Sequence, residues 1–306
     1  MALKDIKNKI KATERTHKVT HAMEAVSAVK MRKTQQSALA GRPYARAALS
    51  ILARLAGSTH VANHPLAEVR PLDQRTSKIA YIVITSDKGL AGALNSAVLK
   101  EVTVDMKELS RTQVIIYAYG RKGEEYFRRR EYTIARAYEN KRDNIALSAM
   151  EELAHEVARG FEAGEFDEVR TIYSNFKSTF EQVPNMRTLL PLSLSGLTKI
   201  VADIAPEKGK FSELRPIEAP LEYKVEPSPE EVLNVLLPRL VSISLYHMLL
   251  EAKASEHSAR MVAMKNASDK SEEVAHDLTR LFNKRRQAAI TREVSEIVGG
   301  REALAA

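Results

Sequence analysis

Two long segments that are almost free of helix-breaking residues lie at the two ends of this chain. Residues 4–40 contain neither Gly nor Pro, and residues 230–298 contain no Gly and only one Pro, Pro238. Both segments are rich in Ala, Lys, Arg, Met and Glu, which favour the α-helix. We therefore expect one helix over residues 1–57, disturbed near its single Pro, and a second helix over residues 228–300.

The second helix carries signals for both of its ends. Ser228 is a good N-cap, Pro229 suits the first turn, and Glu231 completes a capping box. Gly299 and Gly300 follow the last residue of the helical pattern, and glycine commonly ends helices. The sequence therefore predicts a helix of about 70 residues.

The lengths of these helices constrain the architecture. At 1.5 Å per residue, the first helix extends roughly 80 Å and the second roughly 105 Å. A compact chain of 306 residues has a diameter of about 50 Å, so we expect the helices to project from the rest. Because single helices are marginal in water, we expect them to pair in a thin antiparallel rod. A helical bundle folded onto the middle of the chain is the alternative.

Apolar and small residues at helical spacing indicate which side chains face inward. In the first helix the expected inward positions are Ile6, Ile10, Thr13, Met23 and Val26. In the second helix they are Leu245, Met248, Leu249, Ala252, Ser255, Ala259, Ala263, Asn266, Val274, Leu278, Leu281, Arg285 and Ala288. Many of these residues are small or polar, so we expect a seam that is weakly hydrophobic compared with that of a leucine-rich coiled coil.

The middle of the chain, residues 76–225, has a different pattern. Runs of β-branched residues alternate with stretches at helical spacing, which is typical of an α/β domain with a largely parallel sheet. The expected strands are residues 78–86, 112–120, 132–137, 169–176 and 186–193, and the expected helices are residues 90–109, 121–130 and 144–163. The predicted fold class is α/β: a Rossmann-like α/β domain plus a long antiparallel coiled coil of the N- and C-terminal helices.

Composition excludes several kinds of site. The chain has no Cys, which excludes disulfide bridges, cysteine-ligated metals and thiol catalysis. No run of about 18 apolar residues occurs, so we expect no membrane-spanning segment, and the N-terminus lacks the pattern of a secretory signal. His17 and His21 have the i, i+4 spacing of metal ligands without a third ligand, so we interpret them as a surface or seam pair. We expect no catalytic residues, no cofactor and no metal.

The positive charge is concentrated in the first helix. Residues 1–56 hold twelve Lys and Arg against three acidic residues, a net charge of +9, whereas the whole chain carries +8. Such a segment indicates an anionic partner (nucleic acid, a membrane surface or an acidic protein) or a solvated face. The segment lacks interleaved aromatic residues, which disfavours binding of single-stranded nucleic acid.

A loop with two glycines, residues 86–95, follows the first expected strand. Phosphate-binding loops occupy this position, but the sequence matches neither the P-loop nor the dinucleotide-binding pattern. We interpret it as a tight strand-to-helix turn in which Asp87 caps the helix. The residues alone favour a mechanical or interaction protein, and a nucleic-acid-binding protein and a small-molecule enzyme remain as alternatives.

Three blocks of sequence carry a family resemblance. They are IKNKIKATERTHKVTHAMEAVSAVKMRK (6–33), TSDKGLAGALN (85–95) and YHMLLEAKASEHSARMVAMKNASDK (246–270), the last continued by RQAAITREVSEIVGG (286–300). The blocks resemble the gamma subunits of F-type ATP synthases, in the order found in that family and from end to end of the chain. Ala91 stands where many members have Cys, and no Cys-bearing insert lies between residues 190 and 220, so thiol regulation of the plastid kind is not expected.

The resemblance implies the role of a central rotor shaft. In this family the paired terminal helices stand inside a ring of three alpha and three beta subunits, and the α/β domain lies at the foot with the epsilon subunit and the ring of c subunits. Rotation couples transmembrane proton flow to ATP synthesis or hydrolysis on the beta subunits, and the gamma subunit itself is not catalytic. The implied location is peripheral, on the cytoplasmic face of the bacterial inner membrane, with membrane association only through the complex and no nucleic acid as partner.

The resemblance also implies contact residues. Those expected near the beta-subunit lever loops are Met23, Arg260, Arg286, Gln287 and Thr291, and those expected in the apolar collar at the top of the ring are Ile297 and Val298. The lever loops are acidic in the family, which would account for the basic excess of the shaft. An asymmetric pair of helices would present different surfaces to three identical beta subunits and bias each toward a different conformation.

Overall fold

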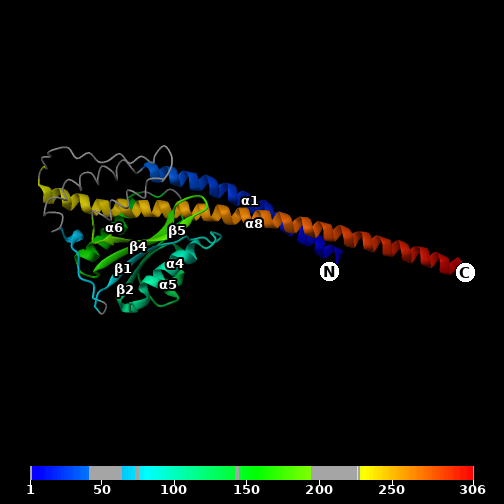
Figure 1. The fold of residues 1–306 in the computed structure, drawn as a ribbon, viewed down its shortest axis with the longest axis horizontal. Helices are drawn as coiled ribbons and strands as arrows, with labels where there is room; N and C mark the ends of the chain where they lie inside the picture. Colours follow the sequence, from blue (N-terminus) through cyan, green and yellow to red (C-terminus); the bar gives the residue numbers. More distant parts are fainter. Residues whose placement is uncertain are drawn as a thin grey trace. The chain divides into compact units, whose positions relative to one another are not determined.

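The computed structural model describes residues 2–40, 64–73, 76–141, 145, 147–193, 226 and 228–305 (Figure 1). Its helices are α1 (Leu3–Ala40), α4 (Leu94–Asp105), α5 (Arg121–Arg128), α6 (Leu147–Glu162) and α8 (Pro229–Ala305). Its strands are β1 (Ile79–Ile84), β2 (Val114–Tyr119), β3 (Thr133–Tyr138), β4 (Glu168–Phe176) and β5 (Gln182–Leu190). The expected continuation of the first helix over residues 41–57, and residues 194–225 of the expected α/β domain, lie outside the described residues.

The five strands form one mixed sheet in the order β3-β2-β1-β4-β5. The pairs β1–β2, β1–β4 and β2–β3 are parallel, whereas β4–β5 is antiparallel. Only residues 177–181 separate β4 from β5, and a connection this short joins antiparallel strands, because a parallel crossover needs a dozen residues or more. The expected α/β class with a largely parallel sheet is confirmed, and β5 begins four residues before its expected start.

Alternate residues of the strands pack into two different cores. Ala80, Ile82 and Ile84 of β1 belong to a core shared with α6 and the first part of α8. Ile79, Tyr81 and Val83, which point to the other face of the sheet, pack against α4 and α5. The strand period of two therefore buries both faces of the sheet, as expected for a sheet covered by helices on both sides.

The chain divides into two compact units. Unit 1 comprises Met1–Ser27 and Arg260–Ala306, and unit 2 comprises Ala28–Ala259. Unit 1 therefore holds one part each of α1 and α8, and unit 2 holds the sheet with α4, α5, α6 and the first part of α8. The division into residues 1–57, 76–225 and 228–300 remains a sequence-based prediction.

The helix α8 is a single element of 77 residues. Its start agrees with the prediction, since the Ser228 hydroxyl accepts a hydrogen bond from the Glu231 amide at 3.2 Å. Its predicted end is wrong, because the helix passes through Gly299 and Gly300 and continues to Ala305. Glycine costs only about 1 kcal/mol inside a helix, and the Arg-Glu-Ala-Leu-Ala sequence that follows is made of good helix formers.

One part of α8 has the length and composition of a membrane span, contrary to the sequence-based expectation. Within Glu230–Val298, an 18-residue stretch has a mean hydropathy of 1.4, and 61% of that stretch is buried inside the protein. Core helices of soluble proteins meet the same description. Leu233, Leu237, Leu240 and Val241 of α8 belong to the core beneath the sheet, so packing against the sheet accounts for the apolar character.

Candidate functional site

The two terminal helices pair along a seam within unit 1. The His17 Nδ1 atom lies 3.1 Å from the Ser268 carbonyl oxygen and 3.0 Å from its hydroxyl. The marked N- and C-terminal ends of the two helices point to the same side in Figure 1, so this pairing is antiparallel. The expected antiparallel coiled coil is therefore confirmed, and His17 is a seam residue, as its spacing suggested.

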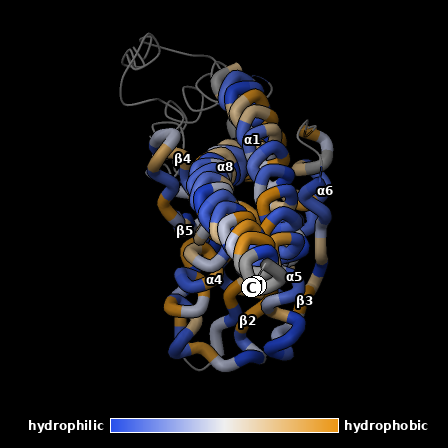
Figure 2. Tube along the Cα trace, turned by 90° about the vertical axis from the view of Figure 1, so that its right-hand side faces the viewer, coloured by the Kyte–Doolittle hydropathy of each residue, from blue (hydrophilic) through white to orange (hydrophobic). Residues whose placement is uncertain are grey.

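The seam follows a heptad pattern. At this spacing the buried and half-buried positions on α1 are Ile6, Ile10, Thr13, His17, Thr20, Glu24 and Ser27, and on α8 they are Met264, Ser268, Ser271, Ala275, Leu278 and Phe282. The steps of three and four residues are those of a coiled coil. Figure 2 shows hydrophilic and hydrophobic residues mixed along α1 and α8, in keeping with a weakly hydrophobic seam.

Apart from Ser268, whose hydroxyl meets His17 of the other helix, the hydroxyl groups of the seam form hydrogen bonds within their own helix. The Thr13 hydroxyl donates to the Lys9 carbonyl at 2.9 Å, and the Ser27 hydroxyl donates to the Met23 carbonyl at 2.7 Å. Because these donors are paired inside one helix, the seam buries small polar side chains without leaving unpaired donors. This arrangement allows close packing with few cross-helix bonds.

Several expected inward positions are wrong. Val26 is 54% exposed and Val274 is 37% exposed, and Asn266, Leu281, Arg285 and Ala288 are also exposed. Selecting apolar residues favoured Val26 over its neighbour Ser27, although the heptad spacing places Ser27 in the seam. Arg285 and Ala288 have a different reason: the pairing of His17 with Ser268 places Leu3, the first residue of α1, opposite Phe282. Beyond that level α8 has no part of α1 beside it.

Met23 and Arg260 lie at one level of the rod. In an antiparallel pair the residue numbers of two opposing positions always add up to the same value. The His17–Ser268 contact therefore places Met23 opposite residue 262, two positions from Arg260. Met23 is half-buried, and only 8% of Arg260 is exposed. The pairing of the two helices thus places these two predicted contact residues at nearly the same position along the rod.

Arg286, Gln287 and Thr291 lie at a different level. At 1.5 Å per residue, Arg286 is about 39 Å along the helix axis from Arg260. All three side chains are exposed, and the Thr291 hydroxyl donates to the Gln287 carbonyl at 3.0 Å. With Lys284 and Arg285, which are also exposed, Arg286 forms a basic cluster just beyond the paired region.

The end of α8 presents an apolar stripe. Ile290, Val294 and Ile297, spaced four and three residues apart, are 51%, 53% and 71% exposed, and Val298 beside them is 50% exposed. This spacing places them on one helix face. The two predicted collar residues, Ile297 and Val298, therefore belong to this stripe.

The glycine loop at residues 86–95 is closed by its own polar groups. The Asn95 side chain accepts from the Ser86 amide at 2.9 Å and donates to the Ser86 hydroxyl at 2.8 Å. Leu90 and Gly92 both have positive φ angles, 64° and 57°, so the turn is tight. The interpretation as a strand-to-helix turn is confirmed.

Asp87 has a different role from the expected cap of the next helix, for which the structure gives Ala93 as N-cap. One carboxylate oxygen of Asp87 accepts from the Arg121 amide at 2.8 Å, at the start of α5. The other accepts from the Asn140 amide at 3.0 Å. Asp87 is buried, so it ties together the chain segments that follow β1, β2 and β3.

A buried polar cluster joins α8 to these segments within unit 2. The Lys253 ammonium donates to the Asn140 carbonyl at 2.5 Å and lies 3.4 Å from the Glu256 carboxylate. Their side chains are only 2% and 7% exposed. The Ser255 hydroxyl donates to the Ser174 carbonyl of β4 at 2.9 Å. Sequence reasoning missed this cluster, because charged residues on a long helix usually face solvent.

Glu251 extends the polar face of α8. Burial raises the pKa of its carboxyl from 4.5 to about 7, and a hydrogen bond with Tyr173 and the charge of Arg187 oppose that rise. Burial also raises the pKa of Tyr173 above its usual value. This pair lies between α8 and β4, so the helix meets the sheet through ionisable groups as well as through its apolar core.

The part of the chain that the structure describes contains no cluster of three or more His, Asp or Glu side chains suited to a metal ion. The ring centroids of His17 and His21 are 6.2 Å apart. One ring bonds to Ser268 and the other is exposed, which favours a role in the helix pair over metal binding.

Comparison with known proteins identifies relatives along the whole chain. Residues 2–304 match the family model described as ATP synthase. The chain is 41% identical to the ATP synthase gamma chain of Pelotomaculum thermopropionicum over 303 residues, which covers 99% of both chains. It is 40% identical to that of Roseiflexus castenholzii over 306 residues, which covers 99% of this chain and 98% of that one.

Solved structures share the fold. A chain from the central stalk and c-ring of the Tetrahymena thermophila mitochondrial ATP synthase has a TM-score of 0.57 and 25% identity, covering 82% of this chain and 99% of that chain. A chain of the Euglena gracilis mitochondrial ATP synthase has a TM-score of 0.63 and 18% identity, covering 99% of this chain and 94% of that chain. With long helices at both ends, the α/β sheet and relatives that match from end to end, the chain belongs to the ATP synthase gamma chain family.

Proposed function

We propose that this chain is the central shaft of a bacterial F-type ATP synthase. It turns inside the ring of alpha and beta subunits and couples transmembrane proton flow to ATP synthesis or hydrolysis on the beta subunits. The chain is a non-catalytic subunit of that complex. This role agrees with the relatives named ATP synthase gamma chain and with the central-stalk chain that shares its fold.

The observation that carries the proposal is the unpaired end of α8. From residue 283 to residue 298 every side chain but that of Ala289, which is half-buried, is exposed, including the apolar stripe of Ile290, Val294 and Ile297. An isolated helix is marginal in water, and a contiguous apolar stripe marks an interaction surface. A surrounding ring of subunits provides both the support and the apolar environment that this segment needs.

The two levels of predicted contacts suit two kinds of interaction. At the level of the helix pair, Met23 is half-buried and accessible, whereas Arg260 is almost fully buried and contributes to the packing inside the rod. The second level lies beyond the paired region of α8, where the exposed side chains of Arg286, Gln287 and Thr291 are accessible to a partner. Exposed ion pairs contribute only about 0.2–1 kcal/mol, so contacts of Arg286 with acidic lever loops are weak enough to break as the shaft turns.

The partners and location follow from this role. The alpha and beta subunits surround the rod, and the epsilon subunit and the ring of c subunits bind the α/β unit. The protein is peripheral to the cytoplasmic face of the inner membrane and is held there through the complex. The role of a shaft requires neither a cofactor nor a metal ion.

Co-purification tests the proposal. A tagged form of this chain, expressed with the other subunits of its host, is purified and its complex is weighed intact by native mass spectrometry. We expect one copy of the chain with three alpha and three beta subunits. Recovery of the chain free of these subunits, or in more than one copy per ring, contradicts the rotor role.

A substitution in the rod tests the second contact level. We expect Arg286→Ala to lower ATP-driven proton pumping by about 1.5- to 5-fold while ATP hydrolysis changes less, because one exposed ion pair is lost. Both rates are measured in the same membrane vesicles. The matched control is Arg280→Ala, which removes another exposed Arg of α8 (75% exposed) outside the predicted contacts. Equal effects of the two substitutions contradict the assignment of Arg286.

A further inference from the structure

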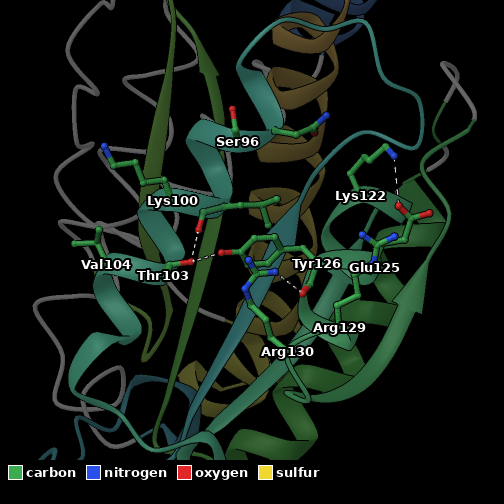
Figure 3. A pocket seen from close by; sticks show the side chains of 11 residues that line it. Ser96, Lys100, Thr103, Val104, Lys122, Glu125, Tyr126, Arg129 and Arg130 are labelled. Carbon is green, nitrogen blue, oxygen red and sulfur yellow. Dashed lines mark hydrogen bonds and ion pairs between the residues drawn. The ribbon is translucent and has the colours of Figure 1, made fainter.

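A groove lies between α4 and α5 on one side of unit 2 (Figure 3). Its volume is about 560 Å³, and residues of α4 line one wall while α5 and the two residues after it line the other. Both helices cover the face of the sheet opposite α6 and α8. The groove therefore belongs to unit 2, whereas the proposed function rests on exposed residues of unit 1.

Positive charge surrounds the groove. Lys100, Lys122, Arg129 and Arg130 line it, and Glu125 is its only acidic residue. Glu125 already interacts with Lys122 at 3.3 Å and with Arg121 at 3.4 Å. Within the described part of the chain, the side chains of Lys100 and Arg129 have no acidic partner. The lining thus carries an excess of three positive charges that an acidic occupant would neutralise.

The floor of the groove is apolar and lacks free donors. Leu99 and the ring of Tyr126 lie at the bottom, and Val104, 61% exposed, lies at the edge. The Thr103 hydroxyl donates to the Leu99 carbonyl at 2.7 Å and lies 3.0 Å from the Tyr126 hydroxyl. Since the Thr103 proton is used, the Tyr126 hydroxyl is the donor in that second bond. Both hydroxyl protons are therefore occupied, and the bond from Tyr126 joins α5 to α4.

One face of the Tyr126 ring is also occupied. The Arg130 guanidinium carbon lies 3.6 Å from the centre of the Tyr126 ring, and Arg130 Nη1 donates to the Tyr126 carbonyl at 3.2 Å. A nucleotide base thus finds this face of the ring covered by a guanidinium group, and a small oxyanion finds no free hydroxyl donor at the floor. Cations at the edge and carbon atoms at the floor instead suit a ligand with separated acidic and apolar groups.

We propose that the α4–α5 groove is a docking surface for a short, acidic, amphipathic segment of a partner protein. An apolar side chain of that segment lies over Leu99 and Val104, and its carboxylates pair with Lys100 and Arg129. From Ser96 to Val104 the wall extends about 12 Å, which matches two turns of helix or about four residues of extended chain. Arginine binds carboxylates in a bidentate manner, which adds orientation to the charge attraction.

Site-specific photo-crosslinking in the assembled complex tests this proposal. A benzophenone amino acid replaces the exposed Val104, and crosslinked peptides are identified by mass spectrometry. We expect an adduct with a segment in which Asp and Glu outnumber Lys and Arg within eight residues of the crosslink. The same probe at Phe180, which is 81% exposed on another part of unit 2, controls for random contact and is expected to label a different segment.

Charge reversal supplies the second arm. Because Lys100 and Arg129 are exposed, Lys100→Glu with Arg129→Glu leaves the fold intact, as circular dichroism of the variant checks. We expect the Val104 adduct to fall about threefold or more, as for two rim ion pairs, and the exchange Lys100→Arg with Arg129→Lys to preserve it. The absence of a Val104 adduct, an adduct with a neutral or basic segment or with lipid, or a yield unaffected by charge reversal overturns the proposal.

Binding of sodium tripolyphosphate tests whether the groove takes a small anion instead of a protein segment. Titration calorimetry of the chain with this probe is expected to give no saturable binding in the micromolar range. Micromolar binding that the charge reversal abolishes assigns the groove to a small polyanion and overturns docking of a protein segment.

Discussion

Replacing Lys253 by Met tests how α8 is held against the α/β sheet. Met keeps the length and most of the volume of the aliphatic stem and removes the ammonium group. That group is buried, donates to the Asn140 carbonyl and pairs with Glu256 at 3.4 Å. Removing one partner of a buried ion pair costs about 3–5 kcal/mol, because the other charge stays in a poorly solvated place.

We expect Lys253→Met to lower the free energy of unfolding of unit 2 by about 3 kcal/mol, near the lower limit, because Glu256 has further interactions. For a unit of this size, that loss lowers the melting temperature by about 6–12 °C. Urea unfolding followed by tyrosine fluorescence measures it well. The chain has no Trp, and none of its ten Tyr lies within residues 1–27 or 260–306, so the signal reports unit 2 alone.

Two further variants decide whether the ion pair causes the effect. The double variant Lys253→Met with Glu256→Gln removes both charges, and we expect it to cost less than the sum of the two single variants by about 1–3 kcal/mol. Lys122→Met removes a Lys from a partly exposed pair with the same i, i+3 spacing, and we expect it to cost less than about 1 kcal/mol. A cost below about 1 kcal/mol for Lys253→Met, or additive costs in the double variant, refutes the reasoning.

Three other predictions concern single positions. The raised pKa of Glu251 means that the folded state holds a proton more tightly than the unfolded state, so the contribution of this proton to stability is complete below pH 4.5 and is lost as the pH rises to about 7. In the original chain this loss is at most roughly 1.4 kcal/mol per pH unit, and Glu251→Gln should therefore make the free energy of unfolding less dependent on pH between pH 5 and 7. A pH profile of the variant that runs parallel to that of the original chain contradicts this prediction. Gly120 has a φ of 108°, and an added Cβ would lie 2.1 Å from the Thr85 carbonyl oxygen; Gly120→Ala should cost about 3 kcal/mol or more in urea unfolding, whereas the control Gly89→Ala, with nothing within 4 Å, should cost little. Ile297→Asp should weaken assembly with the alpha and beta subunits in gel filtration without changing the melting temperature of the free chain, because the side chain is 71% exposed in it; equal assembly at limiting concentration excludes an apolar collar contact.

Local features of the sequence were enough to predict most elements of the α/β unit. Ile79–Ile84 and Val114–Tyr119 lie inside the predicted strands, because continuous β-branched runs are typical of buried parallel strands. The start of α8 was equally local, since Ser228 caps it through its own side chain. The start of β5 was missed by four residues: its first residues, Gln182–Asn185, are only half-buried at a sheet edge and lack an apolar run.

Residue choice within the helix pair needed the tertiary structure. The apolar pattern selected Val26 and Val274, whereas the observed seam contains His17, Ser268 and hydroxyl residues. A hydroxyl that bonds to its own helix is as compatible with burial as a small apolar side chain, so hydropathy alone does not locate such a seam. The predicted contacts Met23 and Arg260 were placed at one level only when the register of the two helices was known, whereas the separation of about 39 Å between Arg260 and Arg286 follows from helix geometry alone.

The sequence by itself determined the long helices, the α/β class and the family, because helix propensity, strand patterns and family motifs are properties of neighbouring residues. The tertiary structure alone decided that Lys253 and Glu256 are buried together, that Asp87 bonds to the start of α5 instead of capping α4, and that four cations from α4, α5 and the residues directly after α5 surround one groove. In each case the groups involved meet through packing of elements distant in the chain. The burial of a side chain and its ion pairs and hydrogen bonds depend on which residues pack against it. Those residues are distant in the chain, so the neighbouring sequence does not reveal them.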